Sequence, residues 1–335
     1  IGGRSLPQNY PKPGTCQLLI NEKGKFIDKI DAYAPSLKNV GMVKDAKWVN
    51  LLGDEKKELL VAGEFMPLMI FEVANGIIKP RASISGLEDY VGWWNTIEVL
   101  DVEGDGDMDI IAGNLGLNSR YKASATEPLS AYASDFDGNG TLDAVLTYYN
   151  QGREYPLADR ATITQQMPPI KKKFTNNLKY AESTIDKVLP QPVLERAYQV
   201  KATHFQSSYF INNGDGTFQM KEMPLQAQFT RVNDMLIFDY DQDGYHDILL
   251  AGNSYGTEVF TGNYDAQTAL LLRGNGKGEF EAVPLFGSGF IMEGAITAVE
   301  KISIDGDSHI LTLLNADKAH LFRVNSVDWL SQSKL

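Results

Sequence analysis

The sequence contains one cysteine, Cys16, among 335 residues, so no disulfide can form within the chain. Histidine is also scarce, with four residues, and no H-E-x-x-H, G-x-S-x-G or phosphate-loop motif is present. No apolar run is long enough to span a bilayer. These absences exclude a disulfide-stapled domain and a membrane-spanning helix, and they leave an enzymatic activity without a motif to support it.

Basic residues are in the minority. The chain has 31 Lys and Arg against 43 Asp and Glu, which gives a net charge of −12. A nucleic-acid partner is therefore disfavoured, because binding to phosphates needs a basic face. The hydrophobic share of 43% provides a core and argues against general disorder.

The length allows one large all-β domain or two smaller ones. We predict a single domain over residues 1–325 and a tail over 326–335. The opening stretch, residues 1–14, has the character of a strand end followed by a Pro/Gly loop, and no signal peptide is visible. We therefore expect the chain to be a mature or truncated portion of a longer protein.

The negative charge is concentrated in short loops, each followed by an apolar run. Residues 239–253 read DYDQDGYHDILLAGN, and related segments occupy 101–114 and 135–146. Their shared pattern is D-x-[DE]-x-[DN]-G-x-x-D, and eroded copies lie at 50–63 and 301–314. Carboxylates crowded into one loop repel one another, so the pattern indicates a bound cation.

Alternate residues of an extended loop point the same way, so positions 1, 3 and 5 of each loop can converge their oxygens. Glycine at position 6 permits a sharp turn, position 7 can offer its backbone carbonyl, and the acid at position 9 completes the shell. All-oxygen ligation selects a hard cation, and calcium is favoured over magnesium. We predict about three Ca²⁺ ions, with the weakest binding in the loop that has Asn139, and no metal at the eroded copies. The predicted ligands are Asp101, Glu103, Asp105, Asp107 and Asp109, then Asp135, Asp137, Asn139, Thr141 and Asp143, then Asp239, Asp241, Asp243, Tyr245 and Asp247.

Glycine-rich hairpins recur in phase with the acidic loops, at 21–26, 212–218 and 274–280. A spacing of 62 residues separates Phe218 from Phe280, and the same spacing separates Asp239 from Lys301. Each repeat can be drawn as four antiparallel strands, which is a propeller blade. We therefore predict an all-β propeller with at least five and up to seven blades. Residues 156–200 have helical spacing, so we expect a helical insertion within one blade.

The loops outside the acidic copies are rich in aromatic residues and arginine. Loops on a rigid scaffold are where binding usually occurs. We predict a ligand-binding face opposite the calcium loops, although any single Trp or Tyr could instead fill a gap between blades. The predicted ligand-binding residues are Trp93, Trp94, Arg120, Tyr121, Arg160 and Tyr255.

The acidic loops, the strand ending in AGN and the hairpin NNGDGTF resemble the FG-GAP/VCBS repeat β-propellers, the broad class that includes the integrin α-subunit head. The segments GGRSLPQNYP, QQMPPIKKKF and SSYFINNGDGTF are more specifically similar to large VCBS-repeat surface proteins of Bacteroidetes associated with ASPIC/UnbV domains. The resemblance implies a propeller fold, calcium, and export to the cell surface, in a family whose molecular functions are mostly unassigned.

Three functions are compatible with this sequence. The first is an extracellular, calcium-stabilised module that binds a glycan or a protein partner. The second is a carbohydrate-active enzyme of the polysaccharide lyase or hydrolase type, for which Arg120 or Arg160 could serve. The third is a structural subunit of a larger outer-membrane or surface complex.

Overall fold

The computed structural model describes residues 1–335 except 54–55, 83, 259–260 and 325–335. The predicted tail at 326–335 therefore lies outside the described residues. The chain is predominantly β, with 39% strand and 12% helix, so the all-β prediction with a minor helical part is confirmed. None of the described helices is long and apolar enough to cross a membrane.

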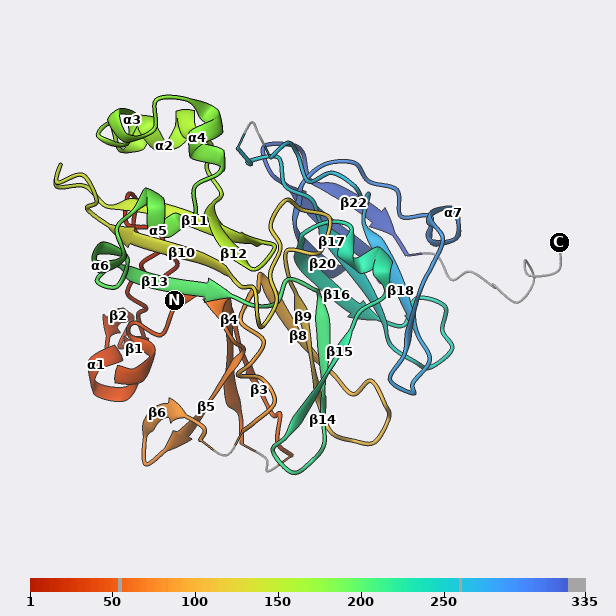
Figure 1. Cartoon of the computed structure of the whole chain (residues 1–335). Coiled ribbons are helices and arrows are strands. Elements are labelled where there is room, and N and C mark those ends of the chain that lie inside the picture. The colour runs from red at the N-terminus through yellow and green to blue at the C-terminus, as the bar shows by residue number, and fades with distance from the viewer. Residues whose placement is uncertain (54–55, 83, 259–260, 325–335) are drawn as a thin grey trace.

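Five antiparallel sheets and an N-terminal hairpin contain the strands (Figure 1). The hairpin is β1 (Leu19–Glu22) and β2 (Lys25–Asp28), and the first sheet is β3 (Met42–Val49), β4 (Glu58–Met66), β5 (Met69–Ala74) and β6 (Ile77–Pro80), with β7 (Gly92–Trp93) paired to β4. The split sheet is β8 (Thr96–Leu100), β9 (Asp109–Gly113), β14 (Ser208–Asn212) and β15 (Phe218–Glu222), and the inserted sheet is β10 (Leu129–Ser134), β11 (Asp143–Asn150), β12 (Arg153–Pro156) and β13 (Tyr198–Ala202). The fourth sheet is β16 (Val232–Phe238), β17 (Asp247–Gly252), β18 (Leu270–Gly274) and β19 (Phe280–Ala282), and the last is β20 (Ile296–Ile304), β21 (Asp307–Leu314) and β22 (His320–Arg323).

The helices are short. They are α1 (Ile30–Tyr33), α2 (Arg160–Gln166), α3 (Ile170–Lys173), α4 (Asn177–Ala181), α5 (Ile185–Val188), α6 (Gln191–Leu194) and α7 (Leu285–Ser288), with 3₁₀ turns at Pro35–Leu37 and Leu225–Gln228. Five of the seven, α2 to α6, lie within 156–200, which confirms the predicted helical insertion. Their apolar side chains, including Ile163 and Met167, pack against Tyr132 and Val145 of the inserted sheet.

Each of the five acidic positions joins the first two strands of a separate sheet, as the repeat predicts. In the fourth sheet the loop at 239–246 connects β16 to β17, and Phe238 pairs with Asp247 where the strands meet the loop. In the last sheet the eroded copy is reduced to a two-residue turn, in which Asp305 and Gly306 both have positive φ, 52° and 89°. Three of the five sheets are four-stranded and antiparallel as predicted, whereas the first has a fifth strand and the last has three strands among the described residues.

The first strands of four sheets lie side by side in the order β3, β8, β16, β20. The same kind of hydrogen bond, from a backbone N–H to an aspartate, joins two different pairs of neighbouring sheets. The Asp45 carboxylate of β3 accepts the Ile97 N–H of β8 at 2.9 Å, and the Asp234 carboxylate of β16 accepts the Val299 N–H of β20 at 2.9 Å. Apolar clusters fill the spaces between consecutive sheets. The four sheets therefore form a row, and the arrangement of this row as blades of a propeller stays a prediction.

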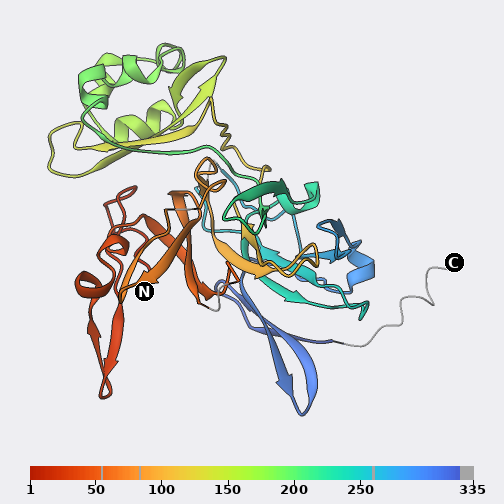
Figure 2. The same cartoon turned by 90° about the horizontal axis from the view of Figure 1, so that it is seen from below.

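The split sheet differs from the expected connectivity. Its first two strands, β8 and β9, precede the inserted sheet in the chain, and its last two, β14 and β15, follow it. Ile110 of β9 pairs with Phe210 of β14 across this interval. The long gap between the acidic copies at 135 and 239 therefore contains the last three strands of the inserted sheet with its helices, in addition to the strands that complete the split sheet. Figure 2 shows the inserted sheet and helices α2 to α6 at one side of the row.

Candidate functional site

The three intact acidic loops fold by the same local hydrogen bonds. The carboxylate at position 1 accepts the backbone N–H of the glycine at position 6, as from Gly106 to Asp101 at 2.9 Å and from Gly140 to Asp135 at 2.9 Å. In the third loop the Gly244 N–H donates to Asp239 at 3.0 Å. All three glycines have positive φ, between 84° and 96°, a conformation that residues with a Cβ rarely adopt. The sequence pattern therefore specifies the loop shape directly.

The acid at position 9 is buried and holds two strands to the loop. Asp109 accepts the Val102 N–H at 2.9 Å and the Asn212 N–H, from the end of β14, at 2.8 Å. Asp247 accepts the Tyr240 N–H at 2.8 Å and the Gly274 N–H, from the end of β18, at 3.0 Å. Sequence reasoning assigned these acids to metal binding only and missed this structural role.

Burial and neighbouring carboxylates disfavour the ionised form of these acids. Burial raises the pKa of Asp109 and of Asp247 to about 6, and the pKa of Asp143 is raised for the same reason. In each case acids of the same loop raise the pKa further. Backbone N–H groups lower the pKa of each of these acids in turn, and a bound cation would favour their ionised form further.

Two of the three predicted sites bring three acids together. In each, one carboxylate oxygen per residue lies within 4.8 Å of the other two. The triads are Asp135, Asp137 and Asp143, and Asp239, Asp241 and Asp247.

The loop at 101–109 does not form such a group among the residues that the structure describes. Its Glu103 receives an ion pair from Lys221 at 3.2 Å instead. Asp105 and Asp107 are linked to each other by a backbone N–H to carboxylate bond at 3.0 Å. The prediction of a metal site in each of the three loops is therefore supported by geometry at two of them, and one of these is the Asn139 loop, where we expect the weakest binding.

The fourth sheet's loop offers the clearest fit for a hard cation. Asp239 Oδ1 is buried, and no described residue donates a hydrogen bond to it. Arg273 pairs with Asp241 and with Asp243, each at 2.7 Å, so the guanidinium offsets part of the negative charge from one side. The orphaned oxygen and the all-oxygen donor set suit Ca²⁺. The position-7 residues Thr141 and Tyr245 are exposed beside their loops.

The predicted ligand-binding tryptophans turn out to be interior residues. Trp94 is fully buried in the core between the first and split sheets, so the prediction that it faces a ligand is wrong. Trp93 is partly buried, with its ring packed on Phe65, Tyr121 and Phe205 at centroid distances of 5.1–5.3 Å. An indole ring can pack in a hydrophobic core or stack on a sugar, and the sequence alone does not show which of these two roles Trp93 and Trp94 have.

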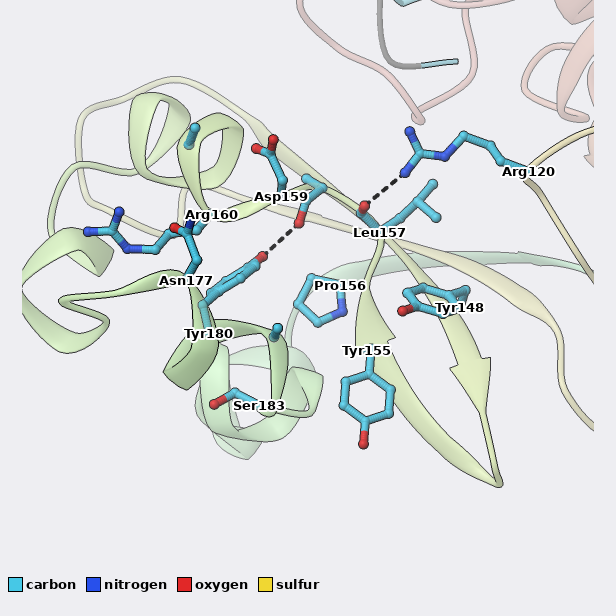
Figure 3. Close-up of a pocket in the computed structure, with 13 residues that line it drawn as sticks. Arg120, Tyr148, Tyr155, Pro156, Leu157, Asp159, Arg160, Asn177, Tyr180 and Ser183 are labelled. Carbon is cyan, nitrogen blue, oxygen red and sulfur yellow. Dashed lines mark hydrogen bonds between the residues drawn. The ribbon is translucent and has the colours of Figure 1, made fainter. Parts of the chain in front are cut away.

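The predicted arginines, by contrast, line a cavity of about 500 Å³ beside the inserted sheet. Figure 3 shows Arg120 reaching in from the 114–128 loop, where its Nη2 donates to the Leu157 carbonyl at 3.1 Å. Arg160 lies at the start of α2 and donates from Nε to the Phe174 carbonyl at 2.7 Å. Tyr255 lies elsewhere on the surface and is 44% exposed.

Three tyrosines also line this cavity. Tyr148 and Tyr155 are partly exposed neighbours on β11 and β12, with ring centroids 6.2 Å apart. Tyr180 of α4 donates to the Ala158 carbonyl at 3.0 Å. Sequence reasoning did not single out these three, although Tyr148 and Tyr155 stand in an aromatic stretch, YYNQGREYP, that signals them.

A second cavity of about 390 Å³ adjoins the first and shares Arg120, Leu157, Ala158 and Asp159 with it. Its wall adds Tyr121, from the predicted set, and Glu258. We call the two cavities together the Arg120 groove. The groove combines flat aromatic rings with a cation and two carboxylates, which is a chemistry suited to polar, ring-shaped ligands.

No model of a known protein family matches this chain, and no curated protein is similar enough to count as a relative.

Proposed function

We propose that this chain is a calcium-stabilised, extracellular β-propeller module that binds a glycan through the Arg120 groove. The observation that carries the proposal is the groove itself, with Tyr148 and Tyr155 side by side and Arg120 and Asp159 within reach. Aromatic rings stack on the apolar faces of sugars, while fixed polar groups select their hydroxyls. The volume of about 500 Å³ lies in the usual range for small-ligand sites.

The acidic loops have a structural part in this proposal. In the split and fourth sheets the acidic loops precede the second strand, β9 or β17. The loops at 114–128 and 253–269 follow the same strands, so they lie at the opposite end from the acidic loops. A cation in each triad would stabilise the scaffold and stand in for the missing disulfides. Export to the bacterial cell surface, as part of a larger surface complex, is the setting in which calcium is plentiful enough for such loops.

The test is a glycan array probed with the wild-type chain and with Tyr155→Ala. Loss of a wild-type signal in the variant, with Tyr33→Ala as the control, supports the proposal, because Tyr33 is an exposed tyrosine of α1 outside the groove. Binding that survives Tyr155→Ala and Arg120→Ala together would contradict it. A protein partner captured by the groove in place of any glycan would contradict the ligand class.

The same protein should be incubated with uronic-acid polymers, and the absorbance of unsaturated products followed. Turnover that requires Arg120 or Arg160 would place the chain among the carbohydrate-active enzymes instead. No turnover together with groove-dependent binding supports a module without catalysis.

A further inference from the structure

Between the first, split and fourth sheets lies a group of buried hydrogen-bond donors without acceptors. Asn95 is 8% exposed, and its Nδ2 has no hydrogen-bond partner among the described residues. The same holds for the buried Nε of Arg231 and the buried Nε1 of Trp93. All three are N–H groups that can only donate. A buried donor left unpaired costs about 1–3 kcal/mol. The Thr230 hydroxyl and the Asn253 amide oxygen beside Arg231 are also unpartnered among the described residues, so N–H donors make up most of the unmet polar groups in this region.

These residues occupy equivalent positions of the repeat. Asn95 directly precedes β8 and Arg231 directly precedes β16, and the two side chains meet, with Arg231 Nη2 donating to Asn95 Oδ1 at 2.6 Å. Trp93 belongs to β7 and pairs with Glu64 at the end of β4. The ends of β4, β8 and β16 thus bring these residues together near the middle of the molecule (Figure 1).

The charge at this place is positive and incompletely balanced. Arg4 makes three hydrogen bonds to Glu64, at 2.9–3.0 Å, and the two neutralise each other. Lys44 and Arg231 have no carboxylate within 4 Å in the described part of the chain. Burial lowers the pKa of both, and Arg231 lowers that of Lys44 further, whereas the Glu64 carboxylate raises the pKa of both and for Arg231 outweighs the opposite effect of Arg4. A half-buried guanidinium beside a second cation is unfavourable unless an anion compensates it.

The repeat shows that this charge is specific to one site. Three second strands contain Ala-Gly followed by a polar residue. Strands β9 and β17 end at that glycine, before Asn114 and Asn253, whereas β4 continues through Glu64 to Met66. Asn114 uses its amide to accept the Trp93 N–H at 3.1 Å. Glu64 instead introduces a charge, which Arg4 balances.

We propose that this cluster, Arg231, Asn95, Trp93 and Lys44, is a binding site for a carboxylate group of a ligand. The carboxylate would accept from the Nε of Arg231 and from the Asn95 amide, with Lys44 at the solvent side. A phosphate dianion suits the site less, because Glu64 lies close by and would repel a second negative charge. Tyr121 connects this site to the Arg120 groove, since its ring contacts Trp93 at 5.1 Å and it lines the groove.

The experiment measures thermal unfolding of the full chain in acetate, glucuronate, phosphate and glucose at equal ionic strength, with chloride as the reference salt. We expect acetate and glucuronate to raise Tm above the chloride value and glucose not to. A larger shift with glucuronate identifies a sugar acid as the source of the carboxylate, and an equal shift identifies the free carboxylate group. A shift with phosphate alone, or none with either carboxylate, overturns the proposal.

Two variants distinguish a carboxylate-binding site from a purely structural role, because the two roles predict different Tm values in chloride and different responses to acetate. Asn95→Asp places a carboxylate against Arg231, so we expect a higher Tm in chloride and loss of the response to acetate. Arg231→Gln removes the uncompensated charge, so we expect Tm in chloride to be unchanged or higher and the acetate affinity to fall by about tenfold or more. Lower Tm in chloride for both variants, with the acetate response retained, contradicts the proposal.

The control variant Lys318→Gln removes an exposed cation from a turn of the last sheet, and its acetate response should equal that of the wild type. The proposal does not depend on glycan binding in the Arg120 groove. Tyr155→Ala should abolish glycan binding and leave the acetate response intact, so failure of one proposal is distinguishable from failure of the other.

Discussion

Replacing Asp239 by asparagine should change stability in opposite directions with and without calcium. Its Oδ1 is buried and unpartnered, and it lies within 4.8 Å of acidic oxygens of Asp241 and Asp247. Two unit charges at about 4.8 Å repel by roughly 3–4 kcal/mol at an effective dielectric constant of about 20. Solvent screening and the ion pairs of Arg273 reduce this, so we expect Asp239→Asn to stabilise the calcium-free protein by about 1–2 kcal/mol.

In calcium the sign reverses. At about 10 mM calcium, roughly 100-fold above a dissociation constant of about 10⁻⁴ M, one site stabilises the fold by about 2.7 kcal/mol. Asp239→Asn should lose most of this increment, because a neutral amide is a weaker ligand for a hard cation than a carboxylate.

The assay is urea unfolding in excess chelator and in calcium, with free energies from linear extrapolation. Asp317→Asn, at an exposed turn of the last sheet, controls for the loss of one surface charge and should behave as the wild type in both conditions. If Asp239→Asn lowers stability in chelator and leaves the calcium increment intact, the carboxylate is a purely structural capping group and the reasoning is refuted.

Three further predictions concern single residues. Asn139→Asp should tighten calcium binding in the 135–143 loop by about tenfold, and calorimetry showing no change would remove Asn139 from the ligand set. Arg273→Gln should destabilise the protein in chelator by about 1 kcal/mol, because it leaves Asp241 and Asp243 unpaired at a half-exposed site, and equal destabilisation in calcium would argue against its role as a counter-charge. Burial lowers the pKa of His204 to about 4, below its unfolded value of about 6.5, so stability should be constant above pH 6.5 and should fall by about 1–3 kcal/mol between pH 6.5 and 4 as the unfolded chain takes up the proton. Urea midpoints at pH 7 and 4.5 should show this fall in the wild type and a smaller one in His204→Gln.

The local parts of this fold are predictable from the sequence. Residues 247–252 form β17, as the acidic loop before them and the AGN at their end indicate. Helices α2 to α6 fall inside the predicted insertion because their apolar residues recur at helical spacing. These features depend on contacts a few residues apart, which the sequence displays directly.

The remainder depends on contacts between distant segments. Nothing near Ile110 indicates that its partner is Phe210, a hundred residues later, so the split sheet could not be read from the repeat. The donor cluster likewise unites Asn95 with Arg231 from loops that are unremarkable on their own. Trp94 is buried because a second sheet packs over it, and the residue type alone does not indicate that this sheet is present.

The order of strands in the split sheet also has a consequence for synthesis of the chain. Strand β9 ends at Gly113 and its neighbour β14 begins at Ser208, so 95 residues must leave the ribosome before that edge can be covered. At about 5–20 residues per second this takes roughly 5–20 s. During that time the apolar edge of β9 is open to pairing with other nascent chains, while the inserted sheet and its helices, complete in sequence by Ala202, can already fold. When the chain is expressed at a high level, we therefore expect part of it to aggregate, because β14 is synthesised long after the strand that it covers.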